Sequence, residues 1–365
     1  MDWEEITLGN VIYINRKNIS KNNDFSYINY YDISSIGTGL KKEFKYYKIE
    51  DMPSRAKRLI DDKDIIISTV RPIHRAFYYC ENTKYNDVVS TGFAVLTANE
   101  KFIDSRFLYY IISSDDFTNY LVSNEQGATY PAVTPDIIKK AKVKLPPLKT
   151  QKKIASILSN YDKLIENNNQ RIKLLESMAE EIYKEWFVRL RFPEIKGLKW
   201  ESKKLGDISN FFNGKSIKKS SVGDYPIFGA NGTIGRSDKY QYENIIIVGR
   251  VGVYCGSIFH VKERCWATDN TIILKPNSDD ILFIKYFLQF KNLNNYAGGS
   301  AQPLLTQTQI KFLLIDYPSK ELLDKFNQLV VPMDNEIENL QQKNKNLKET
   351  RDLLLPKLIH GTLKI

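Results

Sequence analysis

A chain of 365 residues is long enough for two domains of ordinary size, each with its own hydrophobic core. With 42% hydrophobic, 12% aromatic and 26% charged residues, the composition is that of a folded protein and argues against long disordered or fibrous segments. The 53 Lys and Arg residues outnumber the 43 Asp and Glu residues, and the resulting formal charge of +10 favours a polyanionic partner.

The cysteines and histidines give no sign of a covalent or metal framework. There are three of each, scattered without a CxxC pair or other ligand spacing, so we expect neither disulfides nor structural zinc. The chain begins with acidic residues and without a signal-peptide core, and apolar runs such as residues 245–248 are far too short to span a bilayer. These features predict a cytoplasmic protein with no membrane partner.

The chain repeats itself at an offset of 172 positions. Five residues of the first half recur in the second at this offset: Gly127, Pro131, Thr134, Ile138 and Pro146 match Gly299, Pro303, Thr306, Ile310 and Pro318. The match continues from Asp162 and Asp334 to Leu175 and Leu347. Near the start of each half, Trp3-Glu4 and Leu8-Gly9 match Trp200-Glu201 and Leu205-Gly206 at an offset of 197. The repeat unit is therefore a whole domain with an appendage.

In chain order, each half begins with strand-like runs and ends with a helical pattern. The runs are rich in β-branched and aromatic residues and are bounded by Gly, Pro or Asn; they cover residues 64–70, 88–96, 244–248 and 271–274. From Ile154 to Trp186, apolar residues recur at alternating steps of four and three, which predicts a heptad seam with one polar break at Asn168. The offset seam runs from Phe326 to Leu358.

Prolines suggest where the two helices begin. Pro146-Pro147 excludes an earlier start for the first helix, and Thr150 is a suitable cap. In the second helix, Pro332 predicts a kink or a fresh start, which leaves residues 333–354 as the regular part. The boundaries we expect are a first domain at 1–149, a helix at 150–190, a linker at 191–199, a second domain at 200–320 and a second helix at 321–365.

Catalytic motifs are missing from the sequence. There is no GxxxxGK[ST] phosphate loop, no dinucleotide-binding fingerprint, and no Asn/Asp-Pro-Pro-aromatic tetrapeptide of the kind found in amino-methyltransferases of DNA. Asp136 could begin an acidic metal site, but the following residues supply no acidic partner, and a loop aspartate that caps a helix is the simpler interpretation. We therefore predict a chain with no catalytic, cofactor-binding or metal-binding residues.

Several motifs resemble one family. The segment Leu145-Pro146-Pro147-Leu148, followed by Gln151-Lys152 and a heptad helix that ends at Trp186-Phe187, resembles the central conserved region of specificity subunits of type I restriction-modification systems. The segment 354–358, with Gly361, looks like their distal conserved region. The second half departs from this pattern, because Tyr317-Pro318-Ser319 replaces Leu-Pro-Pro and Leu323 stands where Gln151 would be.

The resemblance implies an α+β fold with two tandem target recognition domains of mixed α/β structure, each followed by a long conserved helix. The two helices would form an antiparallel coiled coil with pseudo-twofold symmetry. Each domain would read half of a split sequence in double-stranded DNA. Two modification subunits carrying S-adenosylmethionine would methylate the DNA, and restriction subunits using ATP and Mg²⁺ would translocate and cleave it. Two alternatives stay open: the recognition part of a fused restriction-modification enzyme, and a structural coiled-coil adaptor without a DNA function.

Loop residues of both halves are candidates for DNA contact, because cationic side chains bind phosphates and Arg, Asn, Gln, Ser and Thr read base edges. In the first half the candidates are Arg71, His74, Arg75, Thr129 and Tyr130. In the second half the candidates are Lys215, Asn231, Arg250, Ser300 and Gln302.

The polar breaks in the two seams predict how the helices pair. If Asn168 faces Asn344, partners in an antiparallel pair have numbers that sum to about 512, and Arg351 then faces the ring of Tyr161. A regular coil of about 26 residues is roughly 39 Å long, close to one turn of DNA, so half-site centres should lie about 10 to 12 base pairs apart. Trp186 and Phe187 are candidate anchors for partner subunits, although a core position is the simpler interpretation.

Overall fold

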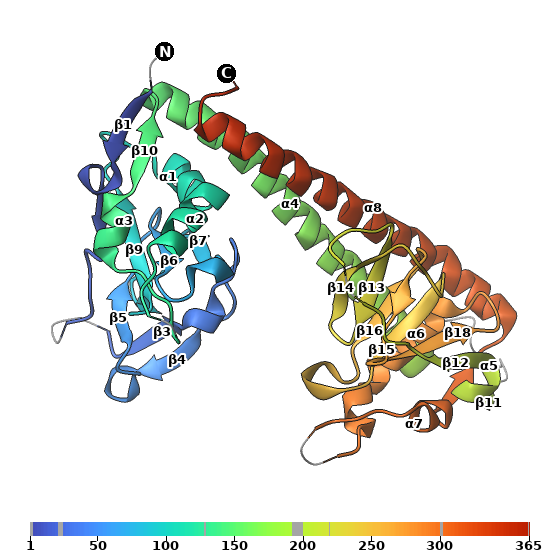
Figure 1. Ribbon diagram of the computed structural model, residues 1–365. Helices are drawn as coiled ribbons and strands as arrows, with labels where there is room; N and C mark the ends of the chain where they lie inside the picture. Colours follow the sequence, from blue (N-terminus) through green and yellow to red (C-terminus); the bar gives the residue numbers. More distant parts are fainter. Residues whose placement is uncertain are drawn as a thin grey trace. The chain divides into compact units, whose positions relative to one another are not determined.

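The computed structural model describes residues 3–20, 25–127, 129–191, 200–218, 220–299, 302–363 and 365. The chain forms two compact units (Figure 1). Unit 1 contains residues 1–167 and 343–365, and unit 2 contains residues 168–342. Each unit is α+β and includes a portion of both long helices.

Unit 1 contains two four-stranded sheets and one pair of strands. The first sheet has the order β2-β9-β6-β7, from Ile12–Ile14, Phe93–Ala98, Ile65–Ser68 and Phe77–Tyr79. The second has the order β4-β3-β8-β5, from Lys45–Lys48, Tyr27–Tyr31, Asp87–Ser90 and Ala56–Leu59. The pair joins β1, Glu4–Thr7, to β10, Lys142–Leu145. Three short helices complete it: α1 Ser105–Ile112, α2 Asp115–Ser123 and α3 Pro135–Lys140.

Unit 2 repeats this plan. Its four-stranded sheet has the order β12-β18-β15-β16, from Ser209–Asn213, Thr271–Pro276, Ile245–Gly249 and Ile258–Val261. A three-stranded sheet has the order β14-β13-β17, from Gly232–Ser237, Tyr225–Gly229 and Trp266–Ala267. The pair joins β11, Glu201–Lys204, to β19, Leu314–Tyr317. The helices are α5 Leu205–Ile208, α6 Ile281–Lys291 and α7 Gln307–Lys311.

The apolar runs of the sequence form the buried central strands of the four-stranded sheets. All four residues of β6 and all five of β15 are buried. The expectation of one strand over residues 88–96 was wrong, because β8 and β9 lie in different sheets. The chain turns between them at Thr91 and Gly92, where Ser90-Thr91-Gly92 interrupts the apolar run.

The long helices are α4, Leu148–Tyr183, which continues into a π-helical turn over Lys184–Val188, and α8, Lys320–Ile359. Helix α4 begins two residues before Thr150, because the carbonyl of Pro147 already accepts from the amides of Thr150 and Gln151. The predicted seams are confirmed by burial: Ile154, Leu158 and Ile165 on α4 are buried, and so are Phe326, Val330, Ile337, Leu340 and Leu358 on α8.

Helix α8 is continuous through Pro332, so of the two alternatives predicted there, a kink or a fresh start, the fresh start was wrong. Proline removes one helical hydrogen bond, but the preceding turns are held by their packing. Leu323, Phe326 and Val330 are all buried in the hydrophobic core of unit 2. Their burial stabilises the helix on the N-terminal side of the proline.

Within each unit α8 lies beside α4 in the antiparallel direction (Figure 1). In unit 1, Arg351 pairs with Asp162 at 2.6 Å, and the Asn344 side chain donates to the carbonyl of Ile165 at 3.5 Å, so that numbers rise along one helix as they fall along the other. The expected contact of Arg351 with the Tyr161 ring was wrong by one residue, because the adjacent carboxylate of Asp162 binds the guanidinium. The pairing of Asn168 with Asn344 stays a prediction.

Gln151 explains one motif of the resemblance. Its side chain is buried and makes three hydrogen bonds in unit 1: it donates to the carbonyls of Pro146 at 2.9 Å and Phe102 at 3.0 Å and accepts from the amide of Asp104 at 2.9 Å. These bonds tie the start of α4 to the segment before α1. In unit 2 the same position is Leu323, which packs in the apolar core.

Replacing Gln151 with Leu should destabilise unit 1 by about 1–3 kcal/mol per backbone group left buried without a partner. Chemical denaturation would measure this loss. Lys152→Leu, a substitution at the exposed neighbouring position, is the control and should change the unfolding free energy by about 0.5 kcal/mol or less. Equal stability of Gln151→Leu and the wild type would contradict the structural function of Gln151.

Candidate nucleic-acid interface

The candidate site of unit 1 is built from two loops that backbone interactions hold together. The β6–β7 loop follows a buried strand, and a bridge joins Val70 to Ala132 of the second loop. The amide of Arg71 donates to the carbonyl of Pro131 at 2.7 Å. Gly127 begins the second loop in the left-handed region, with φ 94°. The predicted residues of these two loops are thereby brought together.

Unit 2 contains the same pair of loops. Val251 bridges Leu304, and the amide of Gly252 donates to the carbonyl of Pro303 at 3.1 Å. The second loop keeps the offset of 172, but the first follows an offset of 181, so Gly252 is the counterpart of Arg71. We call the paired loops of each unit its loop tip: residues 70–76 with 126–132, and residues 251–257 with 298–304, of which 128, 300 and 301 lie outside the described residues.

The backbone of the two tips is alike at two left-handed positions. In unit 2 these are Gly252 and Gly256, with φ of 68° and 87°. In unit 1 they are Arg71 and Arg75, with φ of 49° and 53°. A left-handed conformation costs a residue with a side chain on the order of 1 kcal/mol, and such residues occur in turns and at functional positions. Two arginines at glycine-like positions therefore indicate that their side chains are needed there.

The two arginines have different environments. Arg75 donates to the carbonyl of Ser113 at 2.6 Å and pairs with Asp115, so its guanidinium holds the tip against the start of α2. Arg75 was predicted as a DNA contact, and the structure shows that its side chain also makes a structural contact within the unit. Arg71 is exposed, and its guanidinium lies 5.6 Å from the centre of the Tyr130 ring, without an ion pair to any described residue. Arg71 is the cation that this tip presents to solvent.

Beside Arg71 the tip is hollowed. The hollow has a volume of about 570 Å³, and its walls include three of the predicted residues, Arg71, His74 and Tyr130, with an apolar floor from Ile33, Ile36, Val70 and Ala76. Thr129, the fifth predicted residue of this unit, is exposed next to Tyr130. Donors, an aromatic ring and an apolar floor together match the groups that contact base edges and thymine methyls.

Two predicted residues of unit 2 flank one turn at the same end of the unit. The amide of Lys215 donates to the carbonyl of Ala267 at 2.9 Å. The amide of Arg250 donates to the carbonyl of Asn270 at 3.0 Å. Lys215 is exposed, whereas Arg250 is half-buried, with its Nε enclosed and without a hydrogen-bond partner among the described residues. Arg250 is therefore not the counterpart of Arg71, because its backbone matches that of Thr69.

The other predicted residues of unit 2 lie on or next to its tip. Asn231 is exposed in the β13–β14 turn, where the carbonyl of the preceding Ala230 accepts from the hydroxyl of Ser257. Gln302 is exposed in the tip itself. Ser300 lies outside the described residues. Two exposed residues of this tip, Val253 and Tyr254, were not predicted from the sequence. The only indication of them in the sequence was their position directly after a loop glycine, Gly252.

Trp186 and Phe187 lie in the aromatic core of unit 2. Phe187 packs on Phe283 and Phe326, with ring centroids 4.8 and 5.0 Å apart, and Trp186 packs on Phe326 at 6.1 Å. Both are half-buried. Their use as anchors for partner subunits stays a prediction.

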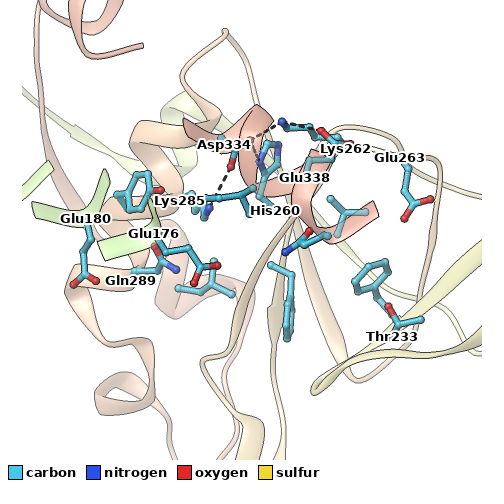
Figure 2. A pocket seen from close by; sticks show the side chains of 17 residues that line it. Glu176, Glu180, Thr233, His260, Lys262, Glu263, Lys285, Gln289, Asp334 and Glu338 are labelled. Atoms are coloured by element: carbon cyan, nitrogen blue, oxygen red, sulfur yellow. Dashed lines mark hydrogen bonds and ion pairs between the residues drawn. The ribbon is translucent and has the colours of Figure 1, made fainter. Parts of the chain in front are cut away.

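Each unit also has an acidic residue that joins its domain to the long helices. In unit 1, Asp162 on α4 accepts from Tyr110 at 2.7 Å and pairs with Arg351. In unit 2 the repeated residue is Asp334 on α8, which lies in a hollow of about 550 Å³ and faces Lys262 at 2.7 Å and both Lys285 and His260 at 3.5 Å (Figure 2). The lysines of this hollow thus pair with the buried carboxylate of Asp334. This cluster of ion pairs forms a joint between the domain and the helix.

The two loop tips on a duplicated α/β frame define a protein with two similar binding ends. A family model, the type I restriction modification DNA specificity domain, matches residues 1–177 and 198–349. The chain belongs to this family and carries two copies of its domain. The resemblance found in the motifs is thereby confirmed, and DNA target recognition is the function of this class.

Curated relatives cover the whole chain. It is 25% identical to the type I restriction enzyme HindI specificity subunit of Haemophilus influenzae, over 99% of this chain and 100% of the relative. It is 26% identical to the MjaIX specificity subunit of Methanocaldococcus jannaschii, over 86% of this chain and 83% of the relative. A solved S subunit from M. genitalium shows the same fold, with a TM-score of 0.58 and 17% identity over 98% of this chain and 96% of that one.

Within the described residues, none of the helices has the length and apolar character of a transmembrane span.

Arg71→Gly tests the assignment of this cation to DNA, because glycine is the residue of the equivalent position in unit 2. Relief of the left-handed backbone and the greater freedom of glycine in the unfolded chain oppose one another, so the unfolding free energy should stay within about 1 kcal/mol of the wild type. Specific DNA affinity should fall by about 1–3 kcal/mol, with relaxed specificity in one half-site only.

Arg75→Gly is the matched control, with the same substitution at the other left-handed arginine. It removes the bonds to Ser113 and Asp115, so it should lower stability by about 1 kcal/mol and keep the target sequence. Denaturation and a binding assay with the co-expressed modification subunits measure the two effects. The assignment of Arg71 fails if Arg71→Gly keeps the wild-type sequence preference.

The joint of unit 2 predicts a dependence of stability on pH. Burial opposes ionisation of Asp334, but hydrogen bonds from His260 and Lys262 and the charge of Lys285 outweigh it and hold the pKa of Asp334 below its ordinary value. A lowered folded pKa gives stability that is present above about pH 4 and lost as the pH falls below it.

Asp334→Asn should therefore cost roughly 3 kcal/mol near neutral pH, and this cost should shrink on acidification below about pH 4. Denaturation of both proteins over this range measures the difference. Asp238→Asn, at an exposed position of the same unit, should show almost no cost at either pH. A cost of Asp334→Asn that does not change with pH would contradict the ion-pair explanation.

Proposed function

We propose that this chain reads a bipartite sequence in duplex DNA, with one half-site read by the loop tip of each unit. The observation that supports this most directly is the repeated backbone of the tips combined with their different side chains. A shared frame presents each tip to the DNA in the same way, and different residues then select different bases. The long helices would set the spacer between the half-sites.

We further propose that the chain is the non-catalytic subunit of its complex. Two modification subunits carrying S-adenosylmethionine would bind one chain, because each of its units offers a similar surface. Restriction subunits using ATP and Mg²⁺ would join through that complex. Among the described residues, no cluster of His, Cys, Asp and Glu side chains is suited to hold a metal ion.

Exchange of one recognition domain tests the proposed function. Residues 200–318 would be replaced by the corresponding segment of a relative with a different target, with both long helices kept. Only one half of the methylated sequence should change, because each tip reads alone. Sequencing of methylated bases in cells that carry the chain and its modification subunits gives the result. A change in both halves, or in neither, would contradict the proposal.

A further inference from the structure

The two loop tips differ most at the residues that follow their first left-handed position. At the offset of 181, Pro72 and Ile73 of unit 1 correspond to Val253 and Tyr254 of unit 2. Pro72 is buried, whereas Val253 is 94% exposed, the highest value among the exposed large hydrophobic residues described, and Tyr254 is 55% exposed. Ile73, the counterpart of Tyr254, is also exposed, at 61%, so the two tips differ at Val253, where unit 2 exposes an apolar side chain and unit 1 buries a proline.

The backbone explains how Val253 is held in the open. The bridge from Val251 to Leu304 and the hydrogen bond from Gly252 to Pro303 fix the loop on one side. On the other side, the amide of Cys255 donates to the carbonyl of Gly252 at 3.0 Å and closes a short 3₁₀ turn over Gly252–Tyr254. Val253 is the middle residue of this turn and is directed away from the core by it.

Gln302 lies next to this turn. A Cβ atom placed on Gly252 would be 3.8 Å from the Nε2 atom of Gln302, so the amide group reaches the residue that precedes Val253. An amide side chain can bind adenine through its N6 and N7 atoms, and an apolar side chain can contact the methyl group of thymine. The two residues together offer the contacts that distinguish A·T from the other base pairs in the major groove.

We propose that Val253 is a specificity-determining residue that contacts a thymine methyl group in the half-site read by unit 2, with Gln302 binding adenine of the same or the adjacent base pair. This inference rests on the proposed function and adds to it the base pair that one tip selects. It also predicts that the two half-sites differ in composition, because Arg71 of unit 1 is suited to guanine.

Thymidine and deoxyuridine differ only by the methyl group of the base, so duplexes with deoxyuridine test this contact directly. The probe is the target found for the wild type by methylated-base sequencing, with deoxyuridine in place of each thymine of the half-site read by unit 2 in turn. Binding is measured with the complex of the chain and its modification subunits. At one position the wild type should bind about fourfold more weakly, the loss expected for one buried methyl group.

Val253→Ser and Val253→Gly identify the residue that makes this contact. Serine has a hydroxyl and no methyl group, and glycine has no side chain, so neither variant keeps an apolar contact with the thymine methyl. Both variants should bind the thymine and deoxyuridine duplexes with ratios near one. Val331→Ala, on α8 of the same unit, is the matched control and should keep the wild-type ratio.

Three results would overturn the inference. The first is a wild type that is insensitive to deoxyuridine at every position, and the second is sensitivity that persists in both Val253 variants. The third is that the Val253 variants lose modification subunits from the complex with an unchanged sequence preference, which would make Val253 part of a protein interface. None of these results affects the proposed function. That function fails instead if the complex of the wild-type chain with its modification subunits methylates no bipartite sequence.

Discussion

Backbone hydrogen bonds between two loops are the constraint on which each binding end depends. Arg71 to Pro131 and Gly252 to Pro303 are the same bond in two settings, and neither uses a side chain. The residues around these bonds are consequently free to differ, while the position of the loops stays the same. The backbone bonds therefore set the position of the loops, and the side chains around them determine which bases are read.

The joints between domain and helix show the opposite pattern. Asp162 and Asp334 are the same residue of the repeat, but one is matched by Arg351 and Tyr110 and the other by Lys262, Lys285 and His260. Asp334 is buried and Asp162 is half-buried, and each carboxylate pairs with cationic side chains from different elements. Here the acidic residue has been kept and its partners have changed.

Much of this could be predicted from the sequence, because the signals were local. Thr134 and Thr306 of the repeat are the caps of α3 and α7, and the heptad steps of α4 and α8 are the buried seam. Only the second loop of each tip was found through the repeat, because the first loops follow a different offset. Contacts set by the tertiary fold could not be predicted: nothing near Arg75 in the sequence indicates Asp115, and the exposure of Val253 depends on loops some fifty residues apart.

The left-handed positions also bear on how such a protein acquires a new target. At the position of Arg71 or Gly252, most substitutions would strain the backbone, so few residues are available to selection there. Tyr130, Val253 and Gln302 are absent from the positions with positive φ and can accept almost any side chain at little conformational cost. Gradual drift of specificity should therefore accumulate at these permissive sites, whereas the left-handed site should change less often, for example when a whole domain is exchanged by recombination.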